Sequence, residues 1–227
     1  MPGKSIPAEL ASDFRRRLIR WFRRHGRDLP WRRTRDPYHV LVSEFMLQQT
    51  QVSRVEDYYA RFVARWPTVD ALAGADPAMV RESWDGLGYY RRAANLHRLA
   101  RAVVARGGGI PSDPGELVRL PGIGRYTAGA VASFAFERAT PAVDTNVARV
   151  LRRAFQPRLQ ASAGSRRVWE LAAAIIPRRR GAAAWAFNQA IMELGATICT
   201  ARVAHCPACP VRAVCTTGRR RAGSGRA

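Results

Sequence analysis

Apolar side chains recur along this chain of 227 residues at the spacing of an α-helix. Leu10, Phe14, Leu18 and Phe22 follow one another every four residues, which predicts an amphipathic helix with arginines on its outer face. Longer apolar patterns predict helices over residues 40–62, 89–105, 146–155, 166–176 and 185–198, and shorter ones after Pro67-Thr68 and Asp76-Pro77. Runs of alternating β-branched residues, which would indicate strands, do not occur. The pattern therefore predicts an all-α protein.

A glycine-rich loop, Leu120-Pro121-Gly122-Ile123-Gly124, joins two further helices predicted within residues 117–136. Glycine permits a tight turn, and the helix that follows begins with unpaired backbone N–H groups. Such a helix start binds phosphate readily, although the same pattern also suits an ordinary helix–helix turn. Gly122 and Gly124 are therefore candidate contacts to a phosphate backbone.

The charge of the chain points to a polyanionic partner. Lys plus Arg number 38 against 17 Asp plus Glu, which gives a net charge of +21. This excess favours a nucleic-acid partner, and a hydrophobic fraction of 47% indicates a folded protein.

Because the sequence has neither an apolar run of the roughly 18 residues that span a membrane nor a signal-type segment, we expect a cytoplasmic, intracellular protein. Residues 218–227 contain only Gly, Arg, Ser and Ala, which predicts a disordered basic tail.

All four cysteines lie near the C-terminus, at Cys199, Cys206, Cys209 and Cys215, with the spacing C-x6-C-x2-C-x5-C. Four thiolates in one short segment can enclose a metal centre. Disulfides are disfavoured in an intracellular protein, and structural zinc usually shows two C-x2-C pairs where this chain has one. Four cysteines also suit a 4Fe-4S cluster, so the spacing alone leaves zinc and iron–sulfur open.

Asp144 lies downstream of the two helices joined by the glycine-rich loop, which together form a helical hairpin. It precedes an apolar helix and could cap it through its side chain. A hairpin, then an aspartate, then a cysteine cluster resembles the helix-hairpin-helix, Gly-Pro-Asp superfamily of DNA glycosylases in its endonuclease III branch. Several longer segments resemble the catalytic domain of the MutY-type adenine DNA glycosylases in particular. The matching segments are 29–32 (LPWR), 43–52 (SEFMLQQTQV), 86–90 (GLGYY), 95–97 (NLH), 187–190 (FNQA) and 193–196 (ELGA).

The resemblance implies a monofunctional DNA N-glycosylase of base excision repair that removes adenine mispaired with 8-oxoguanine or guanine. Bifunctional relatives carry a Schiff-base lysine where this sequence has Tyr126, and the only lysine of the chain is Lys4. Tyr126 also matches glycosylases that remove thymine or uracil opposite guanine, which is the alternative activity. A DNA-binding module without catalysis is the alternative of a different class.

The resemblance also implies roles for individual residues. Cleavage of the N-glycosidic bond needs an acid at the base and a carboxylate at the sugar. Glu44, in an apolar helix where burial should raise its pKa, would protonate adenine, while Asp144 would stabilise the sugar cation and Tyr126 and Asn146 would position it. The residues implied to contact the substrate are Arg32, Gln49, Tyr89 and Gln189. Gly122 and Gly124 would contact the DNA backbone, and the four cysteines would bind a 4Fe-4S cluster.

The implied architecture is two helical subdomains that flank a DNA-binding cleft. Residues 32–138 would form a helical bundle with the helix-hairpin-helix, and residues 1–31 plus 139–217 the iron–sulfur cluster subdomain. We expect the protein to bind, as a monomer, double-stranded DNA that contains a mispaired or damaged base. Two features depart from the family. Thr145 replaces a common glycine and predicts ordinary backbone geometry there. Because the sequence ends soon after Cys215, we expect it to lack the C-terminal domain that inspects 8-oxoguanine in the family.

Overall fold

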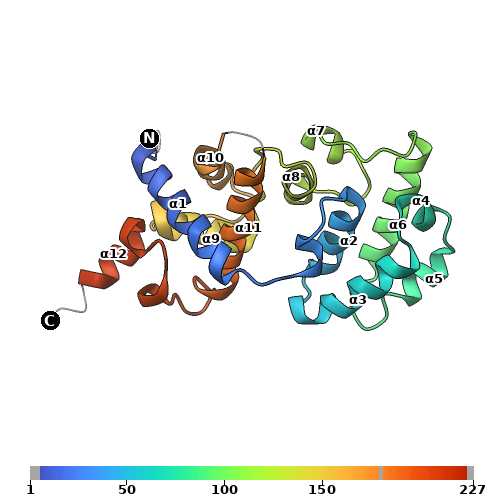
Figure 1. Ribbon diagram of the computed structural model, residues 1–227, viewed down its shortest axis with the longest axis horizontal. Coiled ribbons are helices and arrows are strands. Elements are labelled where there is room, and N and C mark those ends of the chain that lie inside the picture. The colour runs from blue at the N-terminus through green and yellow to red at the C-terminus, as the bar shows by residue number, and fades with distance from the viewer. Residues whose placement is uncertain (1–5, 179–180, 224–227) are drawn as a thin grey trace. The chain divides into compact units, whose positions relative to one another are not determined.

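The computed structural model describes residues 6–178 and 181–223 (Figure 1). Over these residues the chain is built from helices, and its one β-bridge joins Cys199 to Ala204. The predicted all-α fold is confirmed. None of the described helices has both the length and the apolar character to cross a membrane. The chain divides into two compact units, Met1–Arg27 with Glu137–Ala227, and Asp28–Phe136.

The unit that contains both ends of the chain is organised around a buried helix. Its elements are α1 (Ala8–His25), α9 (Thr145–Phe155), α10 (Arg166–Ile175), α11 (Ala182–Thr197), the 3₁₀ turns η2 (Cys206–Ala208) and η3 (Arg212–Val214), and α12 (Thr216–Gly223). Helix α11 packs against both α1 and α9, and α9 also packs against α10 and α12. Helix α11 is apolar around most of its circumference because neighbours cover it on several sides.

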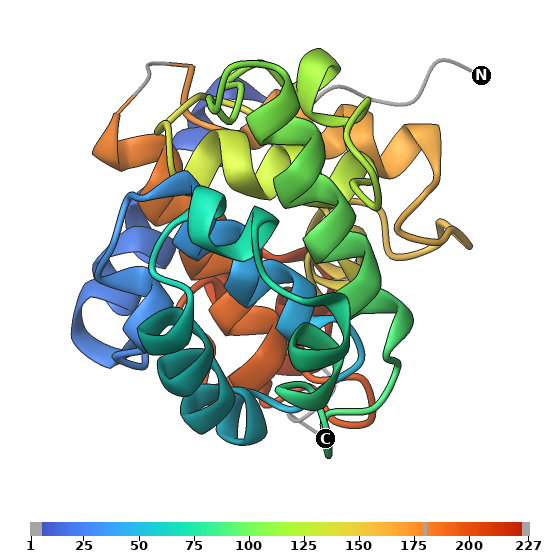
Figure 2. The ribbon, with the colours of Figure 1, turned by 90° about the vertical axis from the view of Figure 1, so that its right-hand side faces the viewer.

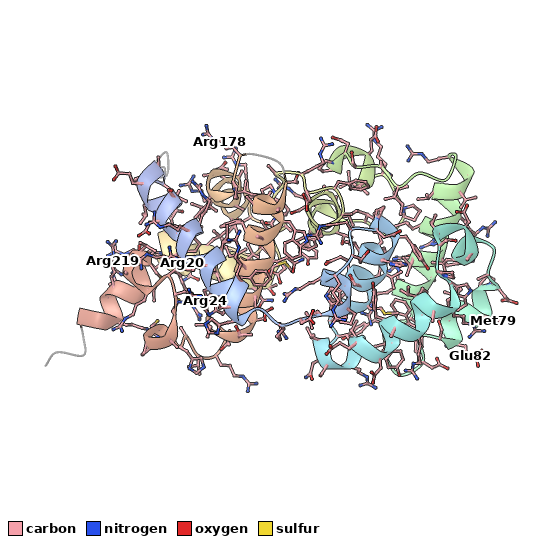
Figure 3. All side chains as sticks on the ribbon, viewed as in Figure 1. Arg20, Arg24, Met79, Glu82, Arg178 and Arg219 are labelled. Atoms are coloured by element: carbon pink, nitrogen blue, oxygen red, sulfur yellow. The ribbon has the colours of Figure 1, made fainter. Side chains whose placement is uncertain are left out.

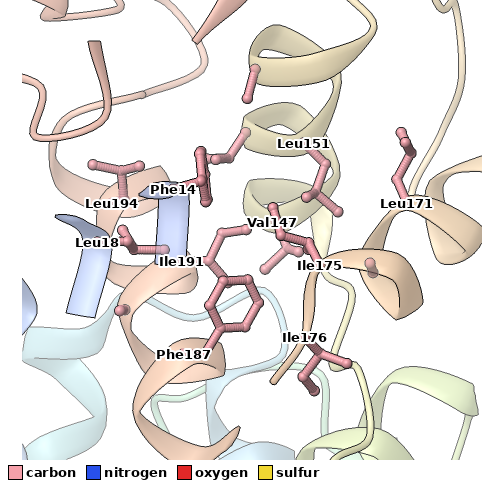
Figure 4. Close-up of a cluster of buried hydrophobic side chains, with 14 of the residues drawn as sticks. Phe14, Leu18, Val147, Leu151, Leu171, Ile175, Ile176, Phe187, Ile191 and Leu194 are labelled. Carbon is pink, nitrogen blue, oxygen red and sulfur yellow. The ribbon is translucent and has the colours of Figure 1, made fainter. Parts of the chain in front are cut away.

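The apolar stripe of α1 forms part of the core of this unit. Phe14 and Leu18 are completely buried and Phe22 is nearly so, which confirms the predicted amphipathic helix. Figure 4 shows Phe14 and Leu18 beside Ile191 and Leu194 of α11, with α9 contributing to the same cluster. The arginines occupy the opposite face, and Figure 3 shows Arg20 and Arg24 projecting away from α1.

The second unit, Asp28–Phe136, is a bundle of shorter helices. Its elements are η1 (Pro30–Arg32), α2 (Pro37–Leu47), α3 (Val52–Arg65), α4 (Val69–Ala73), α5 (Pro77–Glu82), α6 (Arg91–Ala105), α7 (Pro114–Leu117) and α8 (Arg125–Phe134). Helix α6 packs against α4, α5 and α2, and Figure 2 shows α6 in green running beside the teal α4. Thr68 and Asp76 cap α4 and α5 through their side-chain oxygens, as the sequence predicts.

Two boundaries differ from the prediction. The helix predicted over 40–62 is broken at residues 48–51, between α2 and α3, where Gln49 has a left-handed φ of 58°. At the unit boundary, residues 137–138 group with the unit that contains both chain ends, and residues 28–31 group with the bundle. The physical reason is that Trp31 packs edge-on against Tyr59, with ring centroids 5.5 Å apart.

The disordered tail predicted from Gly218 is wrong for Gly218–Gly223, which belong to α12. The Gly218 N–H donates to the Cys215 sulfur at 3.3 Å, and the Arg219 N–H donates to the Cys215 carbonyl at 2.9 Å. The Thr217 hydroxyl donates to the Arg153 carbonyl at 2.7 Å. Two local bonds and one tertiary bond, from Thr217 to Arg153, therefore hold the helix start, and composition alone cannot reveal them. Residues 224–227 lie outside the described residues.

Candidate functional site

Asp144 is held at the start of α9 by two hydrogen bonds. Its Oδ1 accepts the Val147 N–H at 2.7 Å, which makes it the N-cap of the helix, as predicted. Its Oδ2 accepts the side-chain amide of Asn146 at 2.8 Å. Thr145, the first residue of α9, has ordinary helical geometry, so the expectation for this departure from the family is confirmed. The carboxylate therefore has one fixed orientation.

Burial raises the pKa of Asp144 above its ordinary value because desolvation penalises the charged form. The N–H of Val147 and the amide of Asn146 act in the opposite direction, as does the positive charge of Arg149. The aspartate is thus a partly desolvated carboxylate whose ionised form depends on neighbouring donors. Such an environment suits a group that must face a developing positive charge.

Arg149, which the sequence analysis missed, extends this network to the cysteine segment. Its Nη2 donates to Asn146 Oδ1 at 2.7 Å and to the Gly195 carbonyl at 2.8 Å, and its Nε donates to the Cys199 carbonyl at 2.8 Å. A Cβ on Gly195 would lie 2.7 Å from that of Asn146, so glycine lets α11 approach α9 closely. The spacing of three residues between Asn146 and Arg149 on one helix was the signal available in the sequence.

Polar side chains of α11 are buried near the segment that leads to Asp144. The Asn188 amide donates to the Thr140 carbonyl at 2.9 Å and its Oδ1 accepts the Ala142 N–H at 3.5 Å. Gln189, predicted to contact substrate, is also buried, with 6% of its surface exposed. One turn further, Glu193 is 1% exposed and binds the Arg27 guanidinium through both carboxylate oxygens, at 2.7 and 3.0 Å.

The four cysteines line one pocket, together with Arg153 and residues of the connecting loops. Across the described residues, no set of three or more His, Cys, Asp or Glu side chains is arranged to hold a single metal ion. The cysteines are free rather than disulfide-bonded. Burial, with the neighbouring thiols, raises the pKa of Cys209 to about 12, opposed by the Val211 N–H. The pocket therefore brings the predicted ligands together without closing them around one ion.

Hydrogen-bond donors already point at two of these sulfurs. Arg153 Nη1 lies 3.3 Å from the Cys199 sulfur, and the Gly218 N–H lies 3.3 Å from that of Cys215. Donors of this kind stabilise thiolates and tune the clusters that thiolates hold. Four cysteine side chains that line one pocket are the donor set that a 4Fe-4S cluster uses, and this cofactor stays a prediction.

Glu44 lies in the other unit, on α2. It is 4% exposed although it is a carboxylate, and its neighbours Ser43 and Phe45 are buried as well. Helix α2 packs against α8, which carries Tyr126 as its second residue, half-buried. A buried glutamate in an apolar helix is uncommon unless partnered or functional. The fold thus brings the helices of Glu44 and Tyr126 together within one unit.

The glycines of the hairpin loop are not equivalent. Gly122 has a φ of +78°, and a Cβ there would lie 2.8 Å from the Cβ of Asn95 on α6. Gly124 caps α8 with a φ of −93° and has open space where a Cβ would stand. Gly122 is therefore required by the turn, whereas Gly124 leaves the helix start open to a ligand.

Three predicted substrate contacts lie at or near the surface of the same unit. Gln49 is exposed in the loop between α2 and α3 and has a φ of 58°. Tyr89 is 60% exposed in the loop before α6 and has a φ of 49°. Arg32 is partly exposed in η1. Left-handed backbone at non-glycine residues is strained and tends to mark functional segments.

The predicted site residues therefore fall into two groups. Asp144, Asn146, Gln189 and the cysteines belong to the unit with both chain ends, and Glu44, Tyr126, Arg32, Gln49, Tyr89 and the hairpin glycines to Asp28–Phe136. Within each unit the structure brings elements together as described. The meeting of Glu44 and Asp144 at one nucleoside stays a prediction.

Over the described residues, helices with a hairpin, an aspartate that caps a helix and a cysteine pocket define a class of DNA repair fold. The model of the HhH-GPD superfamily of base excision DNA repair proteins matches residues 42–173. The chain belongs to this family.

Individual relatives narrow the comparison. The chain is 46% identical over 226 residues to an adenine DNA glycosylase of Rattus norvegicus, with 94% of this chain and 43% of that protein covered. It is 47% identical over 196 residues to an adenine DNA glycosylase of Mycolicibacterium smegmatis, covering 86% and 66%. The chain thus spans less than two thirds of each of these relatives. A solved thermostable thymine-DNA glycosylase superimposes with a TM-score of 0.86 at 29% identity, covering 93% of this chain and 98% of that one.

Proposed function

We propose that this protein is a DNA N-glycosylase of base excision repair that hydrolyses the bond between adenine and deoxyribose where adenine is mispaired with 8-oxoguanine or guanine. The observation that carries the proposal is the partly desolvated Asp144 carboxylate, oriented by Asn146 and Val147 at the start of α9. The identity to adenine DNA glycosylases over most of the chain supports adenine as the base. The net charge of +21 supports double-stranded DNA as the partner.

In the proposed reaction the two carboxyl groups have different tasks. Glu44, buried in α2, donates a proton to the adenine ring and so makes it a better leaving group. Asp144 remains ionised and stabilises the positive charge that develops on the sugar as the bond breaks. Asn146 and Tyr126 orient the aspartate and the attacking water. The base leaves as neutral adenine, and water then adds to the sugar carbon and gives its proton to the Glu44 carboxylate, which restores the acid.

The target base must leave the helix stack before it can react. Gln49 and Tyr89, exposed on left-handed backbone, enter the duplex and hold it open. Arg32 and Gln189 contact the extruded base, and the hairpin with Gly122 and Gly124 receives a phosphate at the start of α8. The four cysteines would hold a 4Fe-4S cluster, which would supply a structural link that fixes the basic loop around it.

A monofunctional reaction follows from the position of Tyr126. A strand-cleaving glycosylase forms a Schiff base with the sugar through an amine, and arginine cannot do this. The only lysine of the chain is Lys4, near the N-terminus. Treatment with borohydride during turnover is therefore expected to trap no covalent protein–DNA adduct.

Removal of thymine or uracil opposite guanine is the second candidate, because the thymine-DNA glycosylase shares the fold over nearly its whole length. The test is a panel of duplexes that contain A:8-oxoguanine, A:G, T:G or U:G, incubated with the purified chain. Release of adenine from the first two supports the proposal, and release only from the pyrimidine mispairs refutes it. A wild-type protein that binds all four duplexes and releases no base would instead be a binding module.

A further inference from the structure

One buried arginine joins the two loops that carry Gln49 and Tyr89. These are residues 48–51 between α2 and α3, here named the first wedge loop, and residues 83–90 between α5 and α6, the second wedge loop. Arg92, the second residue of α6, is 6% exposed and lies between them. Its guanidinium donates to carbonyls of both loops and of the last turn of α2.

On the side of the first wedge loop, Arg92 completes the end of α2. Its Nη1 donates to the carbonyls of Phe45 at 3.0 Å and Met46 at 2.6 Å, and also to that of Gln48. The last carbonyls of a helix have no intrahelical N–H partner, and the negative end of the helix dipole attracts a cation. Arg92 thus fixes the chain one residue before the left-handed Gln49.

On the side of the second wedge loop, the same guanidinium binds the carbonyls that precede α6. Its Nη2 donates to Leu87 at 3.3 Å and to Gly88 at 2.9 Å, and its Nε donates to Tyr89 at 3.4 Å. The carbon of the guanidinium also lies 5.6 Å from the ring centroids of both Tyr89 and the fully buried Trp84. The planar, forked group therefore has one fixed position.

We propose that Arg92 is a positioning residue that sets the two wedge loops at a fixed spacing, so that Gln49 and Tyr89 enter the duplex as one unit. The proposal rests on the proposed function, because it assigns the two side chains to base extrusion. Each loop alone would have to hold an exposed residue in strained, left-handed backbone geometry. One guanidinium bound to six carbonyls holds both loops.

A lysine at position 92 cannot make the same set of hydrogen bonds to both loops. Its ammonium has three donors on one atom, whereas the arginine fork presents five donors in a plane. The Arg92→Lys variant keeps the charge and can bind one loop, but it loses the rigid connection between the two. Arg92→Met removes every hydrogen bond and preserves the apolar stem. Arg101→Met is the matched control, because Arg101 is exposed on the same helix and the change of charge is equal.

The test separates extrusion from chemistry. A duplex with 2-aminopurine in place of the target adenine, opposite 8-oxoguanine, reports the unstacking of that base by its fluorescence and requires no base release. Since a small misplacement can cost on the order of 100-fold, we expect Arg92→Met to slow the fluorescence rise by at least about tenfold. Arg92→Lys should fall between Arg92→Met and wild type, and Arg101→Met should match wild type.

A second substrate tests whether the loss is general damage to the fold. Adenine in a single-nucleotide bulge needs no opening of a base pair, so Arg92→Met should release it at a rate within about threefold of wild type. A fluorescence rise like that of wild type, or an equal loss of base release on both substrates, would overturn the proposal. If wild type extrudes the base but releases none, the proposed function fails while the fluorescence still decides the role of Arg92.

If neither Arg92 variant folds, variants of Gln49 and Tyr89 in a protein that keeps Arg92 test the proposal. Gln49→Ala and Tyr89→Ala alter exposed side chains, so both proteins are expected to fold. If the two residues act as one unit, the double variant slows extrusion little more than either single variant. Effects that multiply independently would overturn the proposal.

Discussion

The side-chain amide of Asn146 donates to the carboxylate of Asp144 at 2.8 Å, two residues away at the start of α9. Arg149 in turn donates to the carbonyl oxygen of the same Asn146 amide at 2.7 Å, which fixes the amide's orientation. The amide therefore presents its NH₂ group to Asp144, and this donation favours the ionised carboxylate.

This relationship predicts a shift in the pH dependence of base release. Burial raises the pKa of Asp144, and the Asn146 donor lowers it. Asn146→Ala removes a donor to the charged form, so the pKa rises further and the carboxylate is protonated at a higher pH. The acid limb of the single-turnover rate profile is expected to move to higher pH, with the largest loss on the acid side. A variant profile that superimposes on wild type after scaling would contradict the assignment.

The hairpin glycines predict opposite results for two similar substitutions. Gly122→Ala places a side chain at a φ of +78° and 2.8 Å from the Asn95 Cβ, so it should reduce the free energy of unfolding by at least about 1–2 kcal/mol. Gly124→Ala has room at a φ of −93° and should change it by less than about 0.5 kcal/mol. Urea denaturation of the two proteins measures both values. Equal losses would show that the turn is not held as described.

The ion pair between Arg27 and Glu193 predicts a large loss of stability from a single change. Glu193 is 1% exposed, and Arg27→Met would leave its carboxylate buried without that guanidinium. Because the Arg27 side chain is itself 40% exposed and its main-chain N–H still donates to Glu193 at 3.3 Å, the change is expected to cost about 2 kcal/mol, which urea denaturation should report. Asp13→Asn is the control, because Asp13 pairs with Arg16 and Arg17 on the surface, where ion pairs contribute little. A comparable loss in both variants would refute the distinction.

The cysteine pocket predicts the metal content of the purified protein. A chain that binds one 4Fe-4S cluster should be brown and contain about four iron atoms per molecule. Cys209→Ala removes a sulfur from the pocket and should reduce the iron content and the colour together. Elemental analysis of the wild-type protein and the variant checks this. A colourless wild-type protein with one zinc per molecule would contradict the assignment.

The sequence predicted well those features that depend on local pattern. The stripe Phe14, Leu18 and Phe22 repeats every four residues, and the structure buries it. Capping by Asp144 could also be anticipated, because an aspartate before an apolar helix has a short-range reason to be there. These features need only the neighbouring few residues, so a reader of the sequence can find them.

Features that depend on distant partners were missed. At the break after Leu47, the carbonyls of the last turn of α2 accept hydrogen bonds from Arg92, forty-five residues later. Arg149 carries no motif of its own, and its contact with the Cys199 carbonyl spans 50 positions. The start of α12 is likewise held by the hydrogen bond from Thr217 to the Arg153 carbonyl, which spans 64 positions. Long-range hydrogen bonds of this kind leave no periodic trace in a single sequence.

The central claim is that Asp144 serves the release of adenine from DNA. The most direct measurement is the single-turnover rate at which the purified chain releases free adenine from a duplex with one A:8-oxoguanine pair, beside the Asp144→Asn variant. Asparagine keeps an oxygen to cap α9 but carries no charge, so we expect release by wild type, retained DNA binding by the variant, and a loss of at least about 100-fold in its rate. Release of adenine at equal rates by both proteins, or none by wild type, would contradict the account.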